Sequence, residues 1–347
     1  MSRKPKSKKK RSHGPRPAQR RQEREATRQI LEWLAPTSLA EIGHLMATAS
    51  LLRHEAQGGT VEFCAIVNAR SGRCSEDCSF CAQSAHHHTQ AETYPLMDAE
   101  EIVARGRAAA AAGAVRFGIV TSGRDCPGGP ELDNICRAIE RLRAERVIMP
   151  CASLGLLKQD QAERLASAGL ARYHHNLETS PSFFPQVCTT HSYQDREETI
   201  ATARDAGLEL CVGGIVGLGE TPQQRLEFFE AVAGFLPESV PLNFLNPIAG
   251  TRLEQAAPLG ALEALAAIAV CRLVMPMAHI RTCGGRQQVL GRLAPLMYLA
   301  GAGATMIGDY LTTQGGQPGQ DLADLTALGL RPATLDDLFA EYQTEED

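Results

Sequence analysis

Three cysteines stand within eight residues of one another and give the first sign of chemistry. They are Cys74, Cys78 and Cys81, in the spacing C-x-x-x-C-x-x-C. Three thiols cannot all pair with one another, and such short loops strain a disulfide bond, but thiolates ligate zinc, copper(I) and iron–sulfur centres. A closed zinc site normally takes a fourth protein ligand, whereas three thiolates on a four-iron cluster leave one iron open to a small molecule. The run therefore indicates a metal site, with a structural zinc knuckle as the alternative to a cluster.

Polar residues and further cysteines occur near the ends of later strand-like segments. His174, Asn176 and Glu178 alternate along residues 172–178, so strand geometry places them on one face, which is either the protein interior or a solvated exterior. A single buried cysteine is usually a packing residue, but recurrence at the same end of several strands favours ligation. The other candidates at strand ends are Cys151, Cys211, Asn243, Arg281 and Cys283. The cysteines interpreted as packing residues are Cys64, Cys126, Cys136 and Cys271.

These residues lie on a chain in which strand-like and helix-like segments alternate. Eight such alternations, with glycines at helix ends, favour a closed parallel (β/α)8 TIM-type barrel over a doubly wound sheet. The active site of such a barrel lies at the carboxyl ends of its strands, and the cysteine run follows the first strand. The expected strands are residues 61–67, 115–121, 146–152, 172–178, 209–216, 240–245, 278–283 and 304–307.

The segments outside the barrel differ in composition. Residues 26–58 carry apolar side chains at helical spacing and predict an N-terminal helical extension to a barrel over residues 59–330, with a C-terminal tail at 331–347. Residues 1–25 carry a net charge of +9, whereas the whole chain carries −5. Rich in lysine, arginine and proline, this basic tail is expected to be disordered and to bind no nucleic acid.

Composition also limits the location of the protein. The sequence has no run of eighteen apolar residues and no apolar segment after its basic start, so we expect neither a membrane span nor secretion. Eleven cysteines in a chain of this kind indicate reduced thiols and metal ligation rather than disulfides. The expected location is the cytoplasm.

The cysteine spacing, with Phe80 just before the last cysteine, resembles that of the radical S-adenosylmethionine (SAM) superfamily. The resemblance implies a [4Fe-4S] cluster on Cys74, Cys78 and Cys81, whose open iron chelates the amino and carboxylate groups of SAM. An electron from the cluster then splits SAM into methionine and a 5′-deoxyadenosyl radical.

A wider set of motifs resembles the biotin synthase family, in order and spacing, from about residue 60 to 330. The motifs are Gly72–Gln83, 175–180, Gly213–Thr221, Val240–Asn243 and Arg281–Arg286. The resemblance implies insertion of sulfur between two unactivated carbons of dethiobiotin, which forms biotin. One rival interpretation is another radical SAM enzyme of the same barrel group, such as a mutase or a hydrogenase-maturation enzyme. The other is an iron–sulfur scaffold or nucleic-acid-binding protein.

The resemblance also assigns roles to individual residues. Asn243 would hydrogen-bond the ureido ring of dethiobiotin, with His174 nearby. Glu178 stands where many members of the family have aspartate, and this difference preserves a carboxylate at the position. The residues assigned to SAM are Phe80, Asn176, Glu178, Ile215 and Val216. The partners implied are SAM, dethiobiotin, an electron donor such as flavodoxin or ferredoxin, and a second copy of the chain in a homodimer.

A second, deeper cluster donates the sulfur in this family, where it is [2Fe-2S]. Its ligands correspond to Cys151, Cys211 and Arg281, but Gly118 stands where the family's first cysteine ligand is found. We expect Cys188 to supply the missing ligand, because its Cys-Thr-Thr-His motif follows the Glu178 strand end. The alternatives for this ligand are Cys283 and Cys126, and a four-iron cluster is an open possibility.

Overall fold

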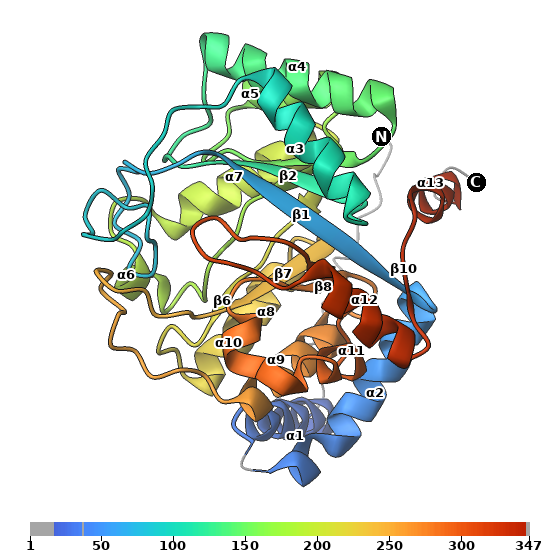
Figure 1. The fold of residues 1–347 in the computed structure, drawn as a ribbon. Helices are drawn as coiled ribbons and strands as arrows, with labels where there is room; N and C mark the ends of the chain where they lie inside the picture. The colour runs from blue at the N-terminus through green and yellow to red at the C-terminus, as the bar shows by residue number, and fades with distance from the viewer. Residues whose placement is uncertain (1–16, 37, 345–347) are drawn as a thin grey trace, which may run out of the picture.

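Parallel strands close into a barrel in the computed structural model, which describes residues 17–36 and 38–344. The strands follow chain order around the barrel, and the last one pairs with the first. The fifth of the eight positions is shared by β5 and β6, so the expected (β/α)8 barrel is confirmed (Figure 1). The strands are β1 (Thr60–Arg70), β2 (Arg116–Thr121), β3 (Met149–Ser153), β4 (Arg172–His174), β5 (Glu209–Cys211), β6 (Gly214–Val216), β7 (Ser239–Phe244), β8 (His279–Thr282) and β9 (Ala304–Met306).

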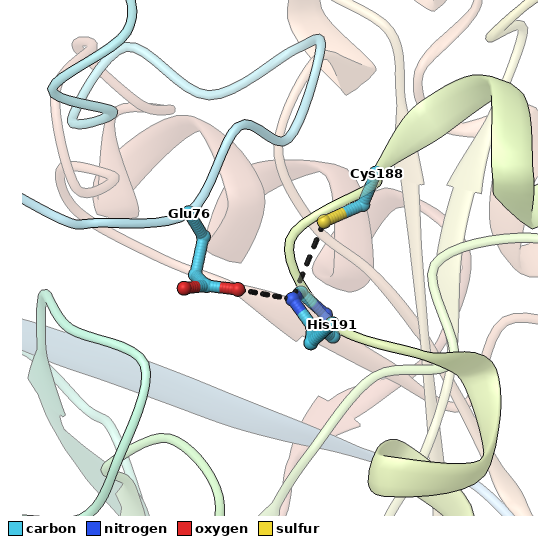
Figure 2. Close-up of side chains that lie close together, drawn as sticks. All are labelled: Glu76, Cys188 and His191. Atoms are coloured by element: carbon cyan, nitrogen blue, oxygen red, sulfur yellow. Dashed lines mark hydrogen bonds and ion pairs between the residues drawn. The ribbon is translucent and has the colours of Figure 1, made fainter.

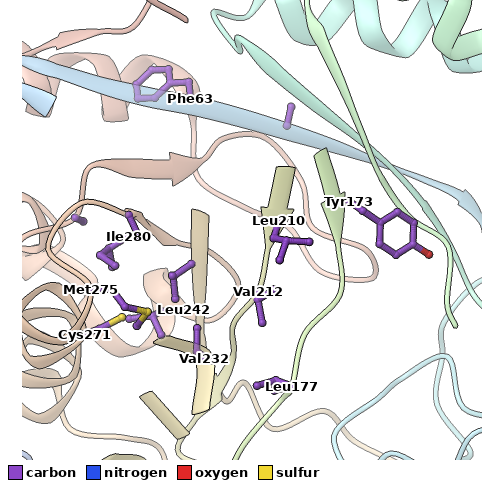
Figure 3. Packing of buried hydrophobic residues seen from close by; sticks show 14 of the residues in the cluster. Phe63, Tyr173, Leu177, Leu210, Val212, Val232, Leu242, Cys271, Met275 and Ile280 are labelled. Atoms are coloured by element: carbon purple, nitrogen blue, oxygen red, sulfur yellow. The ribbon is translucent and has the colours of Figure 1, made fainter. Parts of the chain in front are cut away.

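Helices surround the strands and cover their outward faces. Ser192 and Thr221 cap the helices that follow them by accepting hydrogen bonds from the backbone N–H groups three residues on, which fixes where α7 and α8 begin. Figure 3 shows the layer between strands and helices, where Phe63 and Ile280 belong to the same buried cluster as Cys271 of α9. The surrounding helices are α3 (Ala99–Ala111), α4 (Gly129–Glu145), α5 (Gln159–Ser167), α6 (Phe184–Val187), α7 (Tyr193–Asp205), α8 (Pro222–Ala233), α9 (Ala261–Val274), α10 (Arg286–Leu290), the 3₁₀ turn η1 (Gly291–Leu293) and α11 (Leu296–Leu299).

The strand expected over residues 209–216 is divided between β5 and β6. A Cβ atom on Gly213 would lie 2.0 Å from the carbonyl oxygen of Pro241, and one on Gly214 would lie 2.3 Å from that of Glu178. Glycine is therefore required where the chain passes this close to its neighbours. The fourth strand also ends earlier than expected, at His174. Four residues later, Glu178 adopts φ 68°, a left-handed conformation that does not continue a strand.

The N-terminal extension is longer than predicted. Helix α1 (Pro17–Trp33) already includes residues 17–25, which were expected to belong to a disordered tail, while residues 1–16 lie outside the described part of the chain. Helix α2 (Leu39–Gln57) then packs against α9 and leads into β1. Within the described ranges, no helix is both long and apolar enough to cross a bilayer.

The C-terminal segment is not the tail that was predicted. After α12 (Pro318–Ala327), strand β10 (Arg331–Pro332) pairs in parallel with the start of β1, outside the barrel. Helix α13 (Leu335–Thr344) follows, and its Leu338 is buried in a small cluster with Val115 and Met149. The segment packs because this apolar side chain covers the amino ends of β2 and β3.

Candidate active site

The cysteine run forms a compact loop after β1. The backbone N–H of Cys74 donates to the Gln83 carbonyl at 3.1 Å, and that of Cys81 donates to the Cys78 carbonyl at 3.0 Å. Burial raises the pKa of the Cys74 and Cys81 thiols, to about 11 for Cys81. A hydrogen bond with Cys188, together with burial, raises that of Cys78. Because metal ligation requires thiolates, binding at this loop must release protons.

A cavity of about 340 Å³ opens beside this loop, at the carboxyl ends of the strands. Its lining includes the last residue of β3, of β4, of β5 and of β7, namely Ser153, His174, Cys211 and Phe244. The volume is that of a small-molecule site. The cavity brings together most of the predicted residues: Phe80, Cys81, Cys151, His174, Asn176, Glu178, Cys211, Ile215, Asn243, Arg281 and Cys283.

Four residues of the predicted site are absent from this lining: Cys74 and Cys78, which belong to the adjacent cysteine loop, and Val216 and Cys188, which lie elsewhere. Val216 is fully buried in the main core, whereas its neighbour Ile215 faces the cavity, because successive residues of a strand point to opposite faces. The described residues that line the cavity do not include Cys188, which packs against Cys78 in a separate cluster. The expectation that Cys188 lies beside Cys151 and Cys211 is therefore corrected.

Near the cysteine loop, the cavity wall is polar. The Asn176 side-chain amide donates to a Glu178 carboxylate oxygen at 3.2 Å, and Arg196 donates to the Asn176 carbonyl at 2.7 Å. The Asn176 Oδ1 atom is a buried acceptor with no hydrogen-bond partner among the described residues. A carboxylate and a free amide oxygen beside Cys81 suit a ligand that carries an amino group, as SAM does.

Deeper in the cavity, four buried thiols surround one guanidinium. Cys64, Cys151, Cys211 and Cys283 all line this part, and Arg281 Nη1 lies 4.0 Å from the Cys211 sulfur. His174 Nδ1 lies 3.3 Å from the same sulfur. Burial raises the pKa of the Cys211 thiol, but the charges of His174 and Arg281 outweigh it and bring the value to about 6. Converging soft ligands beside cations fit an iron–sulfur cluster.

Cys64 is the member of this group that sequence reasoning missed. It was interpreted as a packing residue, yet it lines the cavity in phase with Ile66 on β1. Its position on the first strand, two residues from another inward residue, was the only available signal. Gly118 of β2 pairs in register with Cys151 of β3. Because glycine has no side chain, β2 contributes no ligand to the four thiols at the level of Cys151. Cys126, one alternative ligand, lies in the main hydrophobic core instead.

A buried ion network underlies the thiol group. Glu62 accepts from Arg281 at 2.8 Å and from Arg116 at 3.0 Å, and Arg172 lies 3.7 Å away. Burial raises the pKa of the Glu62 carboxyl, but the guanidinium groups, led by Arg116, hold it well below its usual range. Glu209 pairs with two of these arginines, so two carboxylates face three guanidinium groups. The excess positive charge acts to lower the pKa of the thiols nearby, but burial outweighs it at Cys64, Cys151 and Cys283, whose pKa values are raised.

Comparison with known proteins identifies the family. Residues 69–232 match the radical SAM superfamily, and residues 241–331 match the Biotin and Thiamin Synthesis associated domain. The biotin synthase of Geobacter sulfurreducens is 52% identical over 82% of this chain and 87% of its own length. That of Syntrophotalea carbinolica is 50% identical over 84% of this chain and 89% of its own length. The chain belongs to the biotin synthase family.

This membership confirms the predicted radical SAM enzyme and decides against both rival interpretations, another enzyme of the barrel group and a scaffold protein. The superfamily implies a [4Fe-4S] cluster with SAM, and the family implies a second cluster. Among solved structures, methylornithine synthase aligns with a TM-score of 0.77 at 18% identity, over 90% of this chain and 95% of its own. The FeFe-hydrogenase maturase of Carboxydothermus hydrogenoformans aligns with a TM-score of 0.75 at 17% identity, over 90% of this chain and 80% of its own. These two likenesses show the fold.

Proposed function

We propose that this enzyme inserts sulfur into dethiobiotin to form biotin, using SAM and two iron–sulfur clusters. The observation that carries the proposal is that two thiol groups, one at the mouth and one at depth, open onto one cavity of about 340 Å³. When bound, the first cluster and SAM supply the radical that removes hydrogen from an unactivated carbon. The protein's part is to hold the substrate between the two groups and to enclose it.

At the mouth, the three thiols of the cysteine run would hold the first cluster. Glu178 and Asn176 would bind the SAM amino group, since one offers a carboxylate and the other an unpartnered amide oxygen. Phe80 and Ile215 pack in one apolar cluster at the cavity wall and would contact the adenosine part. The four residues assigned to SAM all line the cavity.

At depth, we propose that Cys64, Cys151, Cys211 and Cys283 hold the second cluster. Arg281 already donates to Glu62, and its charge lies among the four sulfurs. We therefore assign it as their charge partner rather than as a ligand. Four thiolates match one ligand for each iron of a four-iron cluster.

Between the two groups, His174 and Asn243 would hold the substrate. Asn243 uses one N–H on the Gly214 carbonyl at 3.2 Å and accepts from the Gly284 N–H at 3.0 Å. One N–H and one lone pair of its amide remain for the urea group of dethiobiotin. His174 uses Nδ1 on Cys211, which leaves Nε2 for the same ligand.

Mössbauer spectroscopy of the anaerobically reconstituted enzyme, with parallel assays of biotin and 5′-deoxyadenosine, tests this assignment. We expect two four-iron clusters in the unaltered protein. Cys64→Ser should lose the deeper cluster and biotin formation while it keeps SAM cleavage. An unchanged second-cluster spectrum and biotin yield in this variant would refute the ligand set, and absence of biotin from the unaltered enzyme would refute the function.

The remaining assignments follow from the chemistry of the reaction. Reducing the first cluster needs a low-potential electron donor, and we propose flavodoxin or ferredoxin. The cysteines of the described chain are all free thiols, which suits the reducing cytoplasm. We further propose that the enzyme acts as a homodimer, which sedimentation analysis would test.

A further inference from the structure

The loop between β7 and α9 contacts the cysteine run through one side chain. Arg252 of this loop donates from Nη2 to the Asp77 carbonyl, and also to the Val187 carbonyl at 3.2 Å. The same nitrogen lies 3.5 Å from an Asp77 carboxylate oxygen. Arg252 thus joins three segments that are far apart in the sequence: the cysteine run, the end of α6 and the loop after β7.

Two of these segments are also bonded directly to each other. The Val187 carbonyl accepts from the Ser79 N–H at 2.9 Å, and the Asp77 carboxylate accepts from the Thr189 N–H at 2.8 Å. The cysteine run and the residues that follow α6 therefore form one platform, and the guanidinium group of Arg252 is fixed to both parts of it.

The connection between α6 and α7 holds the cysteine run by further contacts. His191 contacts a carboxylate oxygen of Glu76, and its Nδ1 atom lies 3.3 Å from the Cys188 sulfur (Figure 2). Glu76 also accepts from Thr190 Oγ1 at 2.8 Å. The side chains of His191 and Glu76 are only 5% and 8% exposed, so water competes little for these contacts. Because none of them involves Arg252, we expect the run to keep its place when Arg252 is replaced.

The loop after β7 forms part of the wall at the proposed SAM site. Ile248 of this loop lines the cavity. Leu253, the neighbour of Arg252, packs in the same apolar cluster as Phe80 and Ile215, which are assigned to the adenosine part of SAM. The position of this loop relative to the cysteine run therefore sets the shape of the wall that SAM would contact.

We propose that Arg252 is a positioning residue for SAM, which holds the loop after β7 against the cysteine run and so fixes the wall made by Phe80 and Ile248. Among the described residues, one other hydrogen bond ties this loop to the segment after the run, from the His88 N–H to the Gly250 carbonyl at 3.3 Å. Without Arg252 the loop would have to be ordered when SAM binds, and such ordering lowers affinity. This role rests on the proposed cluster and SAM site.

Equilibrium dialysis of labelled SAM against the anaerobically reconstituted full chain tests the role. Arg252→Met keeps an unbranched side chain without a donor, and should raise the Kd for SAM about tenfold while the iron content stays unchanged. This factor equals about 1.4 kcal/mol, the size expected for a charged hydrogen-bond donor whose side chain is 46% exposed. In turnover, the KM for SAM should rise with little change in kcat, because the interaction contributes equally before and during the reaction.

Two further variants and one further measurement serve as controls. Arg252→Lys should recover most of the affinity, because a single nitrogen makes all three contacts and an ammonium group can take its place. Arg292→Met removes an exposed arginine of the turn η1 and should leave the Kd unchanged. Hydrogen exchange gives a readout without SAM: the amides of Thr251 and Ala256, in the loop after β7, should exchange faster in Arg252→Met, whereas those of β3 should not change.

Three outcomes would overturn the proposal. One is an unchanged Kd or unchanged loop exchange in Arg252→Met. Another is a loss of affinity that Arg252→Lys does not restore, because the hydrogen bonds would then not be its cause. The third is complete loss of the first cluster from Arg252→Met, which would make Arg252 necessary for cluster assembly rather than for SAM. Absence of a four-iron signal or of SAM binding in the unaltered protein would instead overturn the proposed cluster and SAM site.

Discussion

Glu62 is the residue whose removal should most disturb the floor of the cavity. It is fully buried and faces Arg116, Arg172 and Arg281, so Glu62→Gln keeps the shape but leaves these cations undercompensated. Breaking a buried ion network from one side costs about 3–5 kcal/mol. For 347 residues, an unfolding entropy of about 2.1 cal/mol/K per residue amounts to about 0.7 kcal/mol/K, which predicts a Tm lower by about 4–7 °C.

Thermal unfolding of the cluster-free protein at neutral pH measures this effect. The pKa of Glu62 is held below its usual range in the folded protein, so its stabilisation is fully present at neutral pH and is lost only as the pH falls through that lowered value. Glu230→Gln, an exposed change on α8, is the matched control and should shift Tm by less than about 1 °C. If Glu62→Gln behaves like this control, the network does not stabilise the barrel as argued.

Two further predictions concern the mouth of the cavity and the C-terminal helix. Cys78→Ala leaves two thiolates for the first cluster, so the variant should lose about four irons per chain and all SAM cleavage. Iron analysis and an assay of 5′-deoxyadenosine formation measure these losses. Unchanged 5′-deoxyadenosine formation would contradict the assignment. Leu338→Ala removes a side chain only 1% exposed, between α13 and the barrel, and should lower the unfolding free energy by about 2–4 kcal/mol. A loss below about 0.5 kcal/mol in denaturant titration would show that α13 is loosely attached.

The sequence predicts best what depends on neighbouring residues. The three cysteines of the run sit within one loop, so their spacing alone indicated a metal site. Alternating strands and helices likewise predicted the barrel. The phase of a short strand was harder to foresee: Ile215 and Val216 were both expected at the SAM site, but adjacent strand residues point to opposite faces, and Ile215 is the one that faces inward.

Contacts between distant segments could not be read in the same way. Cys64 and Cys283 are more than two hundred residues apart, and only the closure of β1 against β9 brings their strands to the same cavity. Cys188 lies in a connection without regular periodicity, and its partner could not be inferred from spacing. Strand β10 has two residues, too few to show any alternation.

Strand β1 sets the separation between the two thiol groups. Glu62, Cys64, Ile66 and Asn68 alternate along it and face inward, and Asn68 donates to the Gln83 side chain, next to the cysteine run, at 3.2 Å. With a rise of about 3.3 Å per residue, Cys64 lies roughly 13 Å below Asn68 along the strand. A shift of one residue in register would turn Cys64 towards the helices and detach Asn68 from Gln83 at the same time. A single strand thus fixes both groups, and the space between them is the space in which a substrate must meet the radical and the sulfur donor.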